Sequence, residues 1–334
     1  MKKIFTALAL FLVFSTSAVF AQRTITIKMS SQTPESTPWG NYLNQLAADW
    51  KKISNGQVEL VIFHGRTVGN EETVVQMLRV NQLQAAVLST FGLAEIAPEV
   101  MTLSSPFTIR DDDELDLVLN EVKPELEDRI KKKGFFTLAW SRVGWVKFFS
   151  KTPIFTPADL KKVKLGTLSE YDKLNQVFRA MGFQMVPVAQ QELIIALNSP
   201  MVDAIYNSLI AVGSTQAFGL AKNLASVNVA PFMGAIVINQ RAWNSIPDTY
   251  KPQMIEAVRK REAELDRAVR KFEADMMQTM GNYGLTINQL SPEQEQLWWD
   301  EGKKALPSLV GSLFDKDIYN RIESLLQNYR KKVH

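Results

Sequence analysis

The 334-residue chain contains no cysteine and two histidines, His64 and His334. The absence of cysteine excludes disulfide bonds, thiolate nucleophiles, iron–sulfur clusters and zinc sites built on thiolates. Because one of the two histidines is the last residue, neither a two-histidine metal site nor a serine–histidine enzyme is expected. No nucleophile has a base to accompany it, so a hydrolase is the least favoured class. These absences favour a protein that is not an enzyme and needs no cofactor.

Positive and negative charges are also nearly balanced. The chain has 38 lysine and arginine residues against 35 aspartate and glutamate residues, a formal net charge of +3. A nearly neutral chain lacks the basic excess that nucleic acid attracts, so no nucleic-acid partner is expected. The length corresponds to about two domains of roughly 100–200 residues, each large enough to bury a core.

Residues 1–21 form a segment of their own. They begin with Lys2 and Lys3, continue as an apolar run and end in Val19-Phe20-Ala21. This order is typical of a secretory signal peptide, cleaved here near Ala21. The alternative is an uncleaved membrane anchor, but the apolar run is short for a membrane span. No later run reaches about 18 apolar residues. We therefore expect an exported, soluble protein of the periplasm.

Strand and helix patterns alternate along the rest of the chain. Residues 24–29 read TITIKM, and this alternation of apolar and polar residues predicts a strand. The same reasoning predicts further strands at 58–63 and 85–88, and helices at 39–53, 71–80 and 111–120. A second series follows, with strands at 163–167, 184–186, 204–206 and 235–239 and helices at 169–181 and 191–198. Such an order favours mostly parallel sheets covered by helices.

Two long segments connect the two series. Residues 135–150 read as one long strand interrupted at Gly144, and residues 248–283 read as a helix about 45 Å long. We therefore predict an α/β protein with two lobes, crossing strands and a lobe-spanning helix, in the clamshell fold of periplasmic binding proteins. Lobe I is predicted at 22–143 plus about 233–272, and lobe II at 144–232 plus about 273–334. Hinge closure around a ligand is the expected motion.

Short motifs spread over the chain carry a family resemblance. They are Asn55-Gly56-Gln57-Val58, Ser105-Pro106-Phe107, the stretch PIFTPADL at 153–160, Val202-Asp203 and Trp243. From Arg23 to Trp299, their order and spacing resemble the substrate-binding P subunit of TRAP (tripartite ATP-independent periplasmic) transporters, the DctP-like family. The resemblance implies a periplasmic solute receptor that closes on a small molecule and delivers it to membrane permease subunits.

The residues at the family's ligand site differ from the family pattern. The family places an arginine in the strand after the D-L-K motif and a second one in a G-F-R-x-F stretch; the corresponding residues here are Gly166 and Val146. A family asparagine is matched by Asn207, and Gln190 replaces a frequent aromatic residue. The resemblance thus implies eight candidate ligand-binding residues: Phe91, Trp145, Val146, Gly166, Gln190, Ile205, Tyr206 and Asn207.

The loss of both arginines bears on the ligand. Without a bidentate guanidinium, a buried carboxylate is left unpaired at a cost of several kcal/mol. We therefore expect a hydrophobic or amphipathic ligand, and no high-affinity binding of sialic acid or dicarboxylates. An organic-acid receptor with a relocated arginine, for which Arg142 is the candidate, remains an alternative. So does a degenerate site that binds no ligand.

The loss also bears on the protein's partners. Some TRAP receptors work with a periplasmic tetratricopeptide-repeat protein, and the missing arginines favour that variant here. The alternative from another class is an exported scaffold or interaction protein that kept the fold and lost transport.

Overall fold

A computed structural model describes residues 24–169 and 172–333. The predicted signal peptide, residues 1–21, therefore lies outside the described residues. The strands of the described part are β1 (Ile25–Ser31), β2 (Val58–Phe63), β3 (Ala85–Ser89), β4 (Phe135–Ser150), β5 (Lys164–Leu168), β6 (Gln184–Val188), β7 (Ala204–Ser208), β8 (Asn223–Ala225), β9 (Ala230–Asn239) and β10 (Thr286–Asn288).

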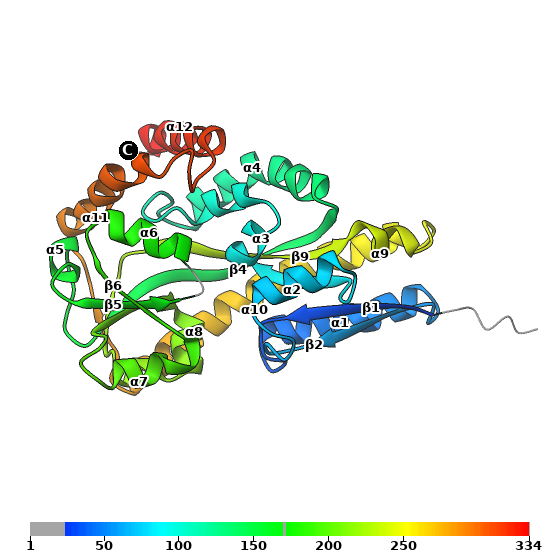
Figure 1. The fold of residues 1–334 in the computed structure, drawn as a ribbon, viewed down its shortest axis with the longest axis horizontal. Helices are drawn as coiled ribbons and strands as arrows, with labels where there is room; N and C mark the ends of the chain where they lie inside the picture. The colour runs from blue at the N-terminus through cyan, green and yellow to red at the C-terminus, as the bar shows by residue number, and fades with distance from the viewer. Residues whose placement is uncertain (1–23, 170–171, 334) are drawn as a thin grey trace, which may run out of the picture.

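The helices surround these strands (Figure 1). They are α1 (Pro38–Ile53), α2 (Glu71–Arg79), α3 (Thr90–Ala94), α4 (Asp112–Lys132), α5 (Pro157–Leu160), α6 (Asp172–Ala180), α7 (Leu193–Leu197), α8 (Leu209–Ser214), α9 (Gln240–Ser245), α10 (Lys251–Asn282), α11 (Pro292–Ala305) and α12 (Lys316–Val333). Short 3₁₀ turns add η1 (Pro98–Ser104), η2 (Gln190–Glu192), η3 (Ala217–Gly219) and η4 (Leu306–Ser308). No helix of the described residues is long and apolar enough to cross a membrane.

The described strands form one mixed sheet. Their order is β2-β1-β3-β9-β4-β7-β5-β6, with β8 beside β4 and β10 beside β8. Strands β1, β2 and β3 pair in parallel at one end, and β5, β6 and β7 do so at the other (Figure 1). The antiparallel pair β9 and β4 stands between these two groups, with β9 beside β3 and β4 beside β7. The two-lobed α/β fold with crossing strands is thereby confirmed.

Strand β4 changes partner along its length. It pairs with β9 from Phe135 to Val146 and with β7 from Val146 to Ser150. The register with β9 shifts between Arg142 and Gly144, which marks a bulge. Gly144 has φ +114°, and a Cβ there would lie 1.8 Å from the Glu273 Oε1 atom of α10. Glycine is therefore required where this strand passes between the lobes.

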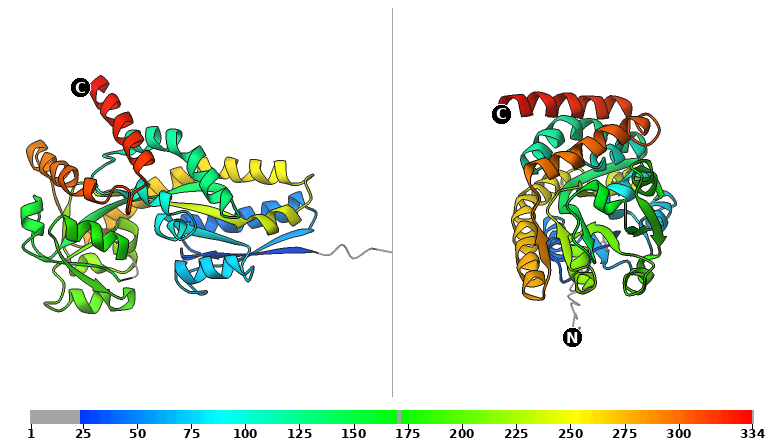
Figure 2. Two further views of the ribbon diagram at one scale, coloured as in Figure 1. Left: turned by 45° about the horizontal axis from the view of Figure 1, so that its top comes forward. Right: turned by 90° about the vertical axis from the view of Figure 1, so that its left-hand side faces the viewer.

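The C-terminal helices contact the cores of both lobes. Helix α11 places Trp298 and Trp299 in a core with Phe148 of β4, whereas α12 places Ile322 and Leu326 in the core beside α4. Figure 2 shows α12 lying across α4. The lobe boundaries drawn from the sequence stay a prediction.

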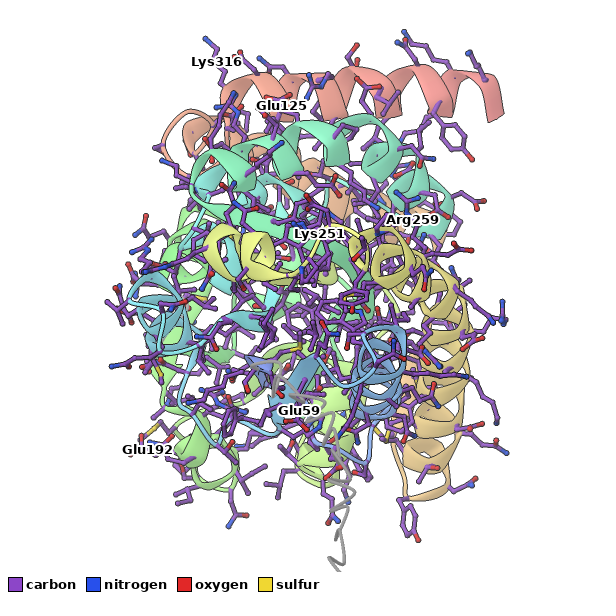
Figure 3. All side chains as sticks on the ribbon, turned by 90° about the vertical axis from the view of Figure 1, so that its right-hand side faces the viewer. Glu59, Glu125, Glu192, Lys251, Arg259 and Lys316 are labelled. Carbon is purple, nitrogen blue, oxygen red and sulfur yellow. The ribbon has the colours of Figure 1, made fainter. Side chains whose placement is uncertain are left out.

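Ion pairs join helix α12 to helix α4. Glu125 of α4 pairs with Arg321 of α12, and Figure 3 shows Glu125 directly below α12. Deeper in the interface, the nearly buried Glu114 accepts hydrogen bonds from Arg330, with Nε 2.7 Å from one carboxylate oxygen and Nη2 2.7 Å from the other. The last helix is therefore held by polar as well as apolar contacts.

Candidate functional site

A cavity of about 390 Å³ lies between the two lobes. This volume is within the range typical of small-molecule sites. Its lining residues are Gln32, Arg66, Asn70, Glu71, Glu72, Ser89, Phe91, Gly92, Ala94, Glu95, Met101, Asp172, Gln176 and Phe232. Helix α6 supplies Asp172 and Gln176 from one lobe, and β9 supplies Phe232. The other lining residues belong to the lobe that holds β1, β2 and β3.

Parallel strands bring the polar lining together. Gln32 directly follows β1, Arg66 lies three residues after β2, and Ser89 ends β3. In open α/β sheets, ligands bind outside the carboxyl ends of the strands, because the loops that follow those strands gather there. The cavity therefore occupies the position that the topology of this sheet favours for a site.

Arg66 is the basic residue among the described residues that line this cavity. Its φ is +63°, and the preceding Gly65 has φ +69°, so the chain turns sharply after β2. A left-handed arginine costs about 1–2 kcal/mol and occurs where surrounding contacts enforce it. Here the Gly69 N–H donates to the Arg66 carbonyl at 3.0 Å, and the Gln32 amide donates to the Gly69 carbonyl at 3.2 Å.

The Arg66 side chain reaches the other lobe. Its Nη1 atom donates a hydrogen bond to Oε1 of Gln190 in η2, 124 residues further along the chain. Arg66 was not among the residues selected from the sequence. The signal that could have found it is the Gly65-Arg66 turn at the carboxyl end of a predicted parallel strand.

Glu71 is tied into the wall of the cavity. Its carboxylate accepts hydrogen bonds from the Ser89 N–H and hydroxyl, each at 2.5 Å, and from the Gly92 N–H at 3.2 Å. A Cβ at Gly92 would lie 2.9 Å from the Glu71 Cδ atom. These contacts hold the start of α3, which includes the lining residues Phe91 and Gly92, against α2.

An apolar surface completes the lining. It consists of Phe91 and Ala94 of α3, Met101 of η1 and Phe232 of β9. Phe91 is the one sequence-selected candidate among the described lining residues. A lining that combines charged and polar groups with aromatic groups makes this cavity suitable for an amphipathic molecule.

Three of the other candidates lie in the sheet of the second lobe. Gly166 pairs with Ile205, and a Cβ at Gly166 would lie 2.7 Å from Val202 Cγ1. Ile205 belongs to the core around α7. Tyr206 packs against Phe178 at 4.8 Å between ring centroids, and burial raises the pKa of its hydroxyl. The described lining of the cavity includes none of these residues.

Of the remaining candidates, Trp145, Val146 and Asn207 lie along and beside β4, and Gln190 lies in η2. Trp145 donates from its indole N–H to the Asp112 carboxylate at 3.0 Å, so it faces α4. Val146 is 6% exposed between β7 and β9. The side-chain oxygen of Asn207 accepts from the Ser208 N–H at 2.9 Å. Gln190 contacts the cavity-lining Arg66 from the other lobe. The assignment of these residues to a ligand site stays a prediction.

Arg142, the candidate in the alternative of a relocated arginine, points elsewhere. Its guanidinium lies 3.3 Å from Asp112, contacts Asp116 and lies 3.7 Å from Asp266. It therefore joins β4 to α4 and α10 and lies outside the cavity lining. The arginine that the structure places in the cavity is Arg66.

Two half-buried charged groups, Glu273 and Lys147, lie near the crossing strand. Burial, helped by the charge of Asp112, raises the pKa of Glu273 to about 7. Burial lowers the pKa of Lys147 to about 8, although its ammonium donates to the Ser226 carbonyl and the Asn228 side chain at 2.8 and 2.7 Å. Across residues 24–169 and 172–333, no group of three acidic or histidine side chains is placed to hold a metal ion.

Sequence comparison finds relatives over most of the chain. The chain is 25% identical over 311 residues to the 2,3-diketo-L-gulonate-binding periplasmic protein of Escherichia coli, covering 91% of this chain and 90% of the relative. It is 23% identical over 296 residues to the C4-dicarboxylate-binding periplasmic protein DctP of Vibrio cholerae, covering 88% and 87%.

Solved structures share the fold. A TRAP periplasmic solute-binding protein from Sulfurospirillum deleyianum with bound succinate has a TM-score of 0.79 at 24% identity, covering 91% of this chain and 99% of that one. Another from Ochrobactrum anthropi, whose C-terminus is bound in its ligand pocket, has a TM-score of 0.82 at 19% identity, covering 93% and 97%. The sequence profile of DctP, bacterial extracellular solute-binding protein family 7, matches residues 29–310, and the chain belongs to this family.

Proposed function

We propose that this solute receptor binds a small amphipathic organic acid with a single carboxylate. Arg66 carries the proposal, because it brings a guanidinium to a cavity that lacks the family's two arginines. A guanidinium has five N–H donors in a planar fork, and it binds a carboxylate through two parallel hydrogen bonds. A ligand carboxylate would add to or replace the present contacts of Arg66.

The apolar side of the cavity supports an apolar ligand body. Phe91, Met101 and Phe232 offer two aromatic rings and a thioether, and Met101 is itself buried. Apolar surface removed from water contributes about 25 cal/mol per Å². The proposed ligand is therefore amphipathic, one of the two kinds expected from the sequence, and its polar group is a carboxylate. Three of the four proteins described above are named for, or bind, organic acids, which agrees with that group.

Acidic residues of the cavity argue against a second ligand carboxylate. Glu72 and Asp172 line the cavity and are exposed. Two like charges about 4 Å apart near a protein surface repel each other by roughly 4 kcal/mol. A dicarboxylate would place its second charge in this surrounding, whereas a monocarboxylate would place an apolar chain there.

Isothermal titration calorimetry with octanoate and succinate tests the proposal. We expect the unmodified protein to bind octanoate more tightly than succinate. Arg66→Ala should weaken octanoate binding about tenfold or more, because it removes a charge-assisted pair. Arg241→Ala, at an exposed position of α9, is the matched control and should bind as the unmodified protein does. Tighter binding of succinate, or an Arg66→Ala variant with unchanged affinity, would refute the assignment.

We also propose the partners of this receptor. Its family supports delivery of the ligand to TRAP permease subunits in the membrane. The absence of arginine at Val146 and Gly166 favours the variant with a tetratricopeptide-repeat protein, in the periplasm. Co-elution of the two purified proteins in size-exclusion chromatography tests this pairing, and strict non-association would favour the ordinary arrangement. Native mass spectrometry separates transport from the scaffold alternative, because a bound amphipathic molecule is expected only for a transport receptor.

A further inference from the structure

The Arg66–Gln190 hydrogen bond joins the two ends of the sheet. Arg66 follows β2 and Gln190 follows β6, and these two strands stand at opposite ends of the strand order. The bond therefore runs from one lobe to the other. Gln190 is exposed and does not line the cavity, whereas Arg66 does. The contact thus lies at the solvent-facing edge of the cavity.

Hydrogen bonds stabilise the turn that carries Arg66, so that its side chain can reach Gln190 in the other lobe. The Gln32 amide and the Gly69 N–H each make a hydrogen bond within this turn. Arg66 has a left-handed backbone, and its N–H points back toward β1, with the nitrogen 3.5 Å from the Ser31 carbonyl oxygen. On the opposite side, Gln190 begins a short 3₁₀ turn directly after β6. This contact across the cavity pairs one amide with one guanidinium, both on segments anchored to strands.

We propose that the Arg66–Gln190 pair is a latch that gates ligand access to the cavity. The proposal rests on the proposed function in that it takes Arg66 as the ligand's anchor. Because a guanidinium has several donors, Arg66 can hold the Gln190 oxygen and a ligand carboxylate together. The latch would close over an empty and a filled cavity alike. It would therefore slow ligand association and dissociation without a large effect on affinity.

Stopped-flow kinetics with octanoate tests the latch. Gln190→Ala should raise both the association and the dissociation rate constants about fivefold or more, while the Kd changes less than about threefold. Gln190→Glu replaces the amide with a carboxylate, which bonds more strongly to a guanidinium, so both rates should fall. Gln191→Ala, at an exposed neighbouring position, is the matched control. Unchanged rates in Gln190→Ala, or a rise in dissociation alone, would overturn the latch; the second result would make Gln190 a ligand contact.

A second measurement needs no ligand. Because the chain has no cysteine, Lys52→Cys in α1 and Lys222→Cys before β8 can carry spin labels as its two thiols. Pulsed electron paramagnetic resonance should show longer distances between the labels when Gln190→Ala is added, and unaltered distances with Gln191→Ala. Longer distances without octanoate binding would support the latch and refute the proposed ligand. Unaltered distances in Gln190→Ala would refute the latch even where octanoate binds.

Discussion

Glu273 combines an unusual pKa with a defined contact. Its carboxylate occupies the space beside Gly144, accepts a hydrogen bond from the backbone N–H of Trp145, and faces Asp112, Lys147 and Arg270. The folded-state pKa of about 7 is above the ordinary value of a glutamate. The folded protein therefore holds this proton more tightly than the unfolded chain. The resulting stabilisation is fully present below the ordinary pKa and is lost as the pH rises through about 7.

Glu273→Gln should remove this pH dependence. The neutral amide can still accept from the Trp145 N–H, and it keeps the shape of the protonated acid. Between pH 5 and pH 8, the free energy of unfolding of the unmodified protein should fall relative to the variant by about 1–2 kcal/mol, after discounting for solvent screening. Urea denaturation at the two pH values measures this difference. Glu256→Gln, at an exposed position of the same helix, should follow the unmodified protein, and the same slope in Glu273→Gln would contradict the assignment.

Individual site residues were only partly predictable. Phe91 could be selected because it follows a short buried strand, where sheet topology places ligands. Arg66 could not, because its contact with Gln190 spans 124 residues and depends on how the lobes face each other. Gly166 and Val146 depart from the family pattern, and this departure shows that arginine is missing at these two positions. It does not predict which other residue brings a guanidinium to the cavity.

Regular elements were more predictable, because alternation of apolar residues is a local signal. The limits predicted at 58–63 and 135–150 are those of β2 and β4. The helix predicted at 111–120 was too short, since α4 continues through Pro124 to Lys132. A proline inside a helix removes one backbone hydrogen bond. Leu126 and Ile130 are buried beyond it, so packing sustains the last turns of α4.

The bulge in β4 gives a prediction at the scale of this element. Gly144→Ala should destabilise the protein by about 2–4 kcal/mol, because the methyl group meets the Glu273 carboxylate and φ is +114°. Gly134→Ala is the matched control: its φ is +90°, but a Cβ there meets nothing within 4 Å. We expect it to cost about 1 kcal/mol, the backbone part alone. Urea unfolding measures both, and equal losses in the two variants would exclude the Glu273 contact.

At the scale of the whole molecule, the cores are shared between segments far apart in the chain. Phe107 packs with Trp298 and Phe148, at 5.5 Å and 6.4 Å between ring centroids, and thus joins the segment before α4, helix α11 and strand β4. Helix α12 packs with α4 in another core. Two of the cores of the described residues therefore include residues of the C-terminal helices α11 and α12.

Differential scanning calorimetry should therefore show one unfolding transition. Shared cores and two continuous strands couple the lobes, so unfolding one removes buried contacts from the other. The calorimetric and van't Hoff enthalpies should agree, as for a cooperative unit. Two resolved transitions in the unmodified, ligand-free protein would show that the lobes unfold independently.

The pairing of strands β4 and β9 bears on the closing motion expected of this receptor. Both run without a break from one lobe to the other, hydrogen-bonded to each other on either side of the Gly144 bulge. A change in the angle between the lobes must therefore be absorbed as twist within a paired ladder. The hinge closure expected from the sequence would then be an elastic deformation of this sheet, with a restoring torque, and would differ in kind from free rotation about a linker.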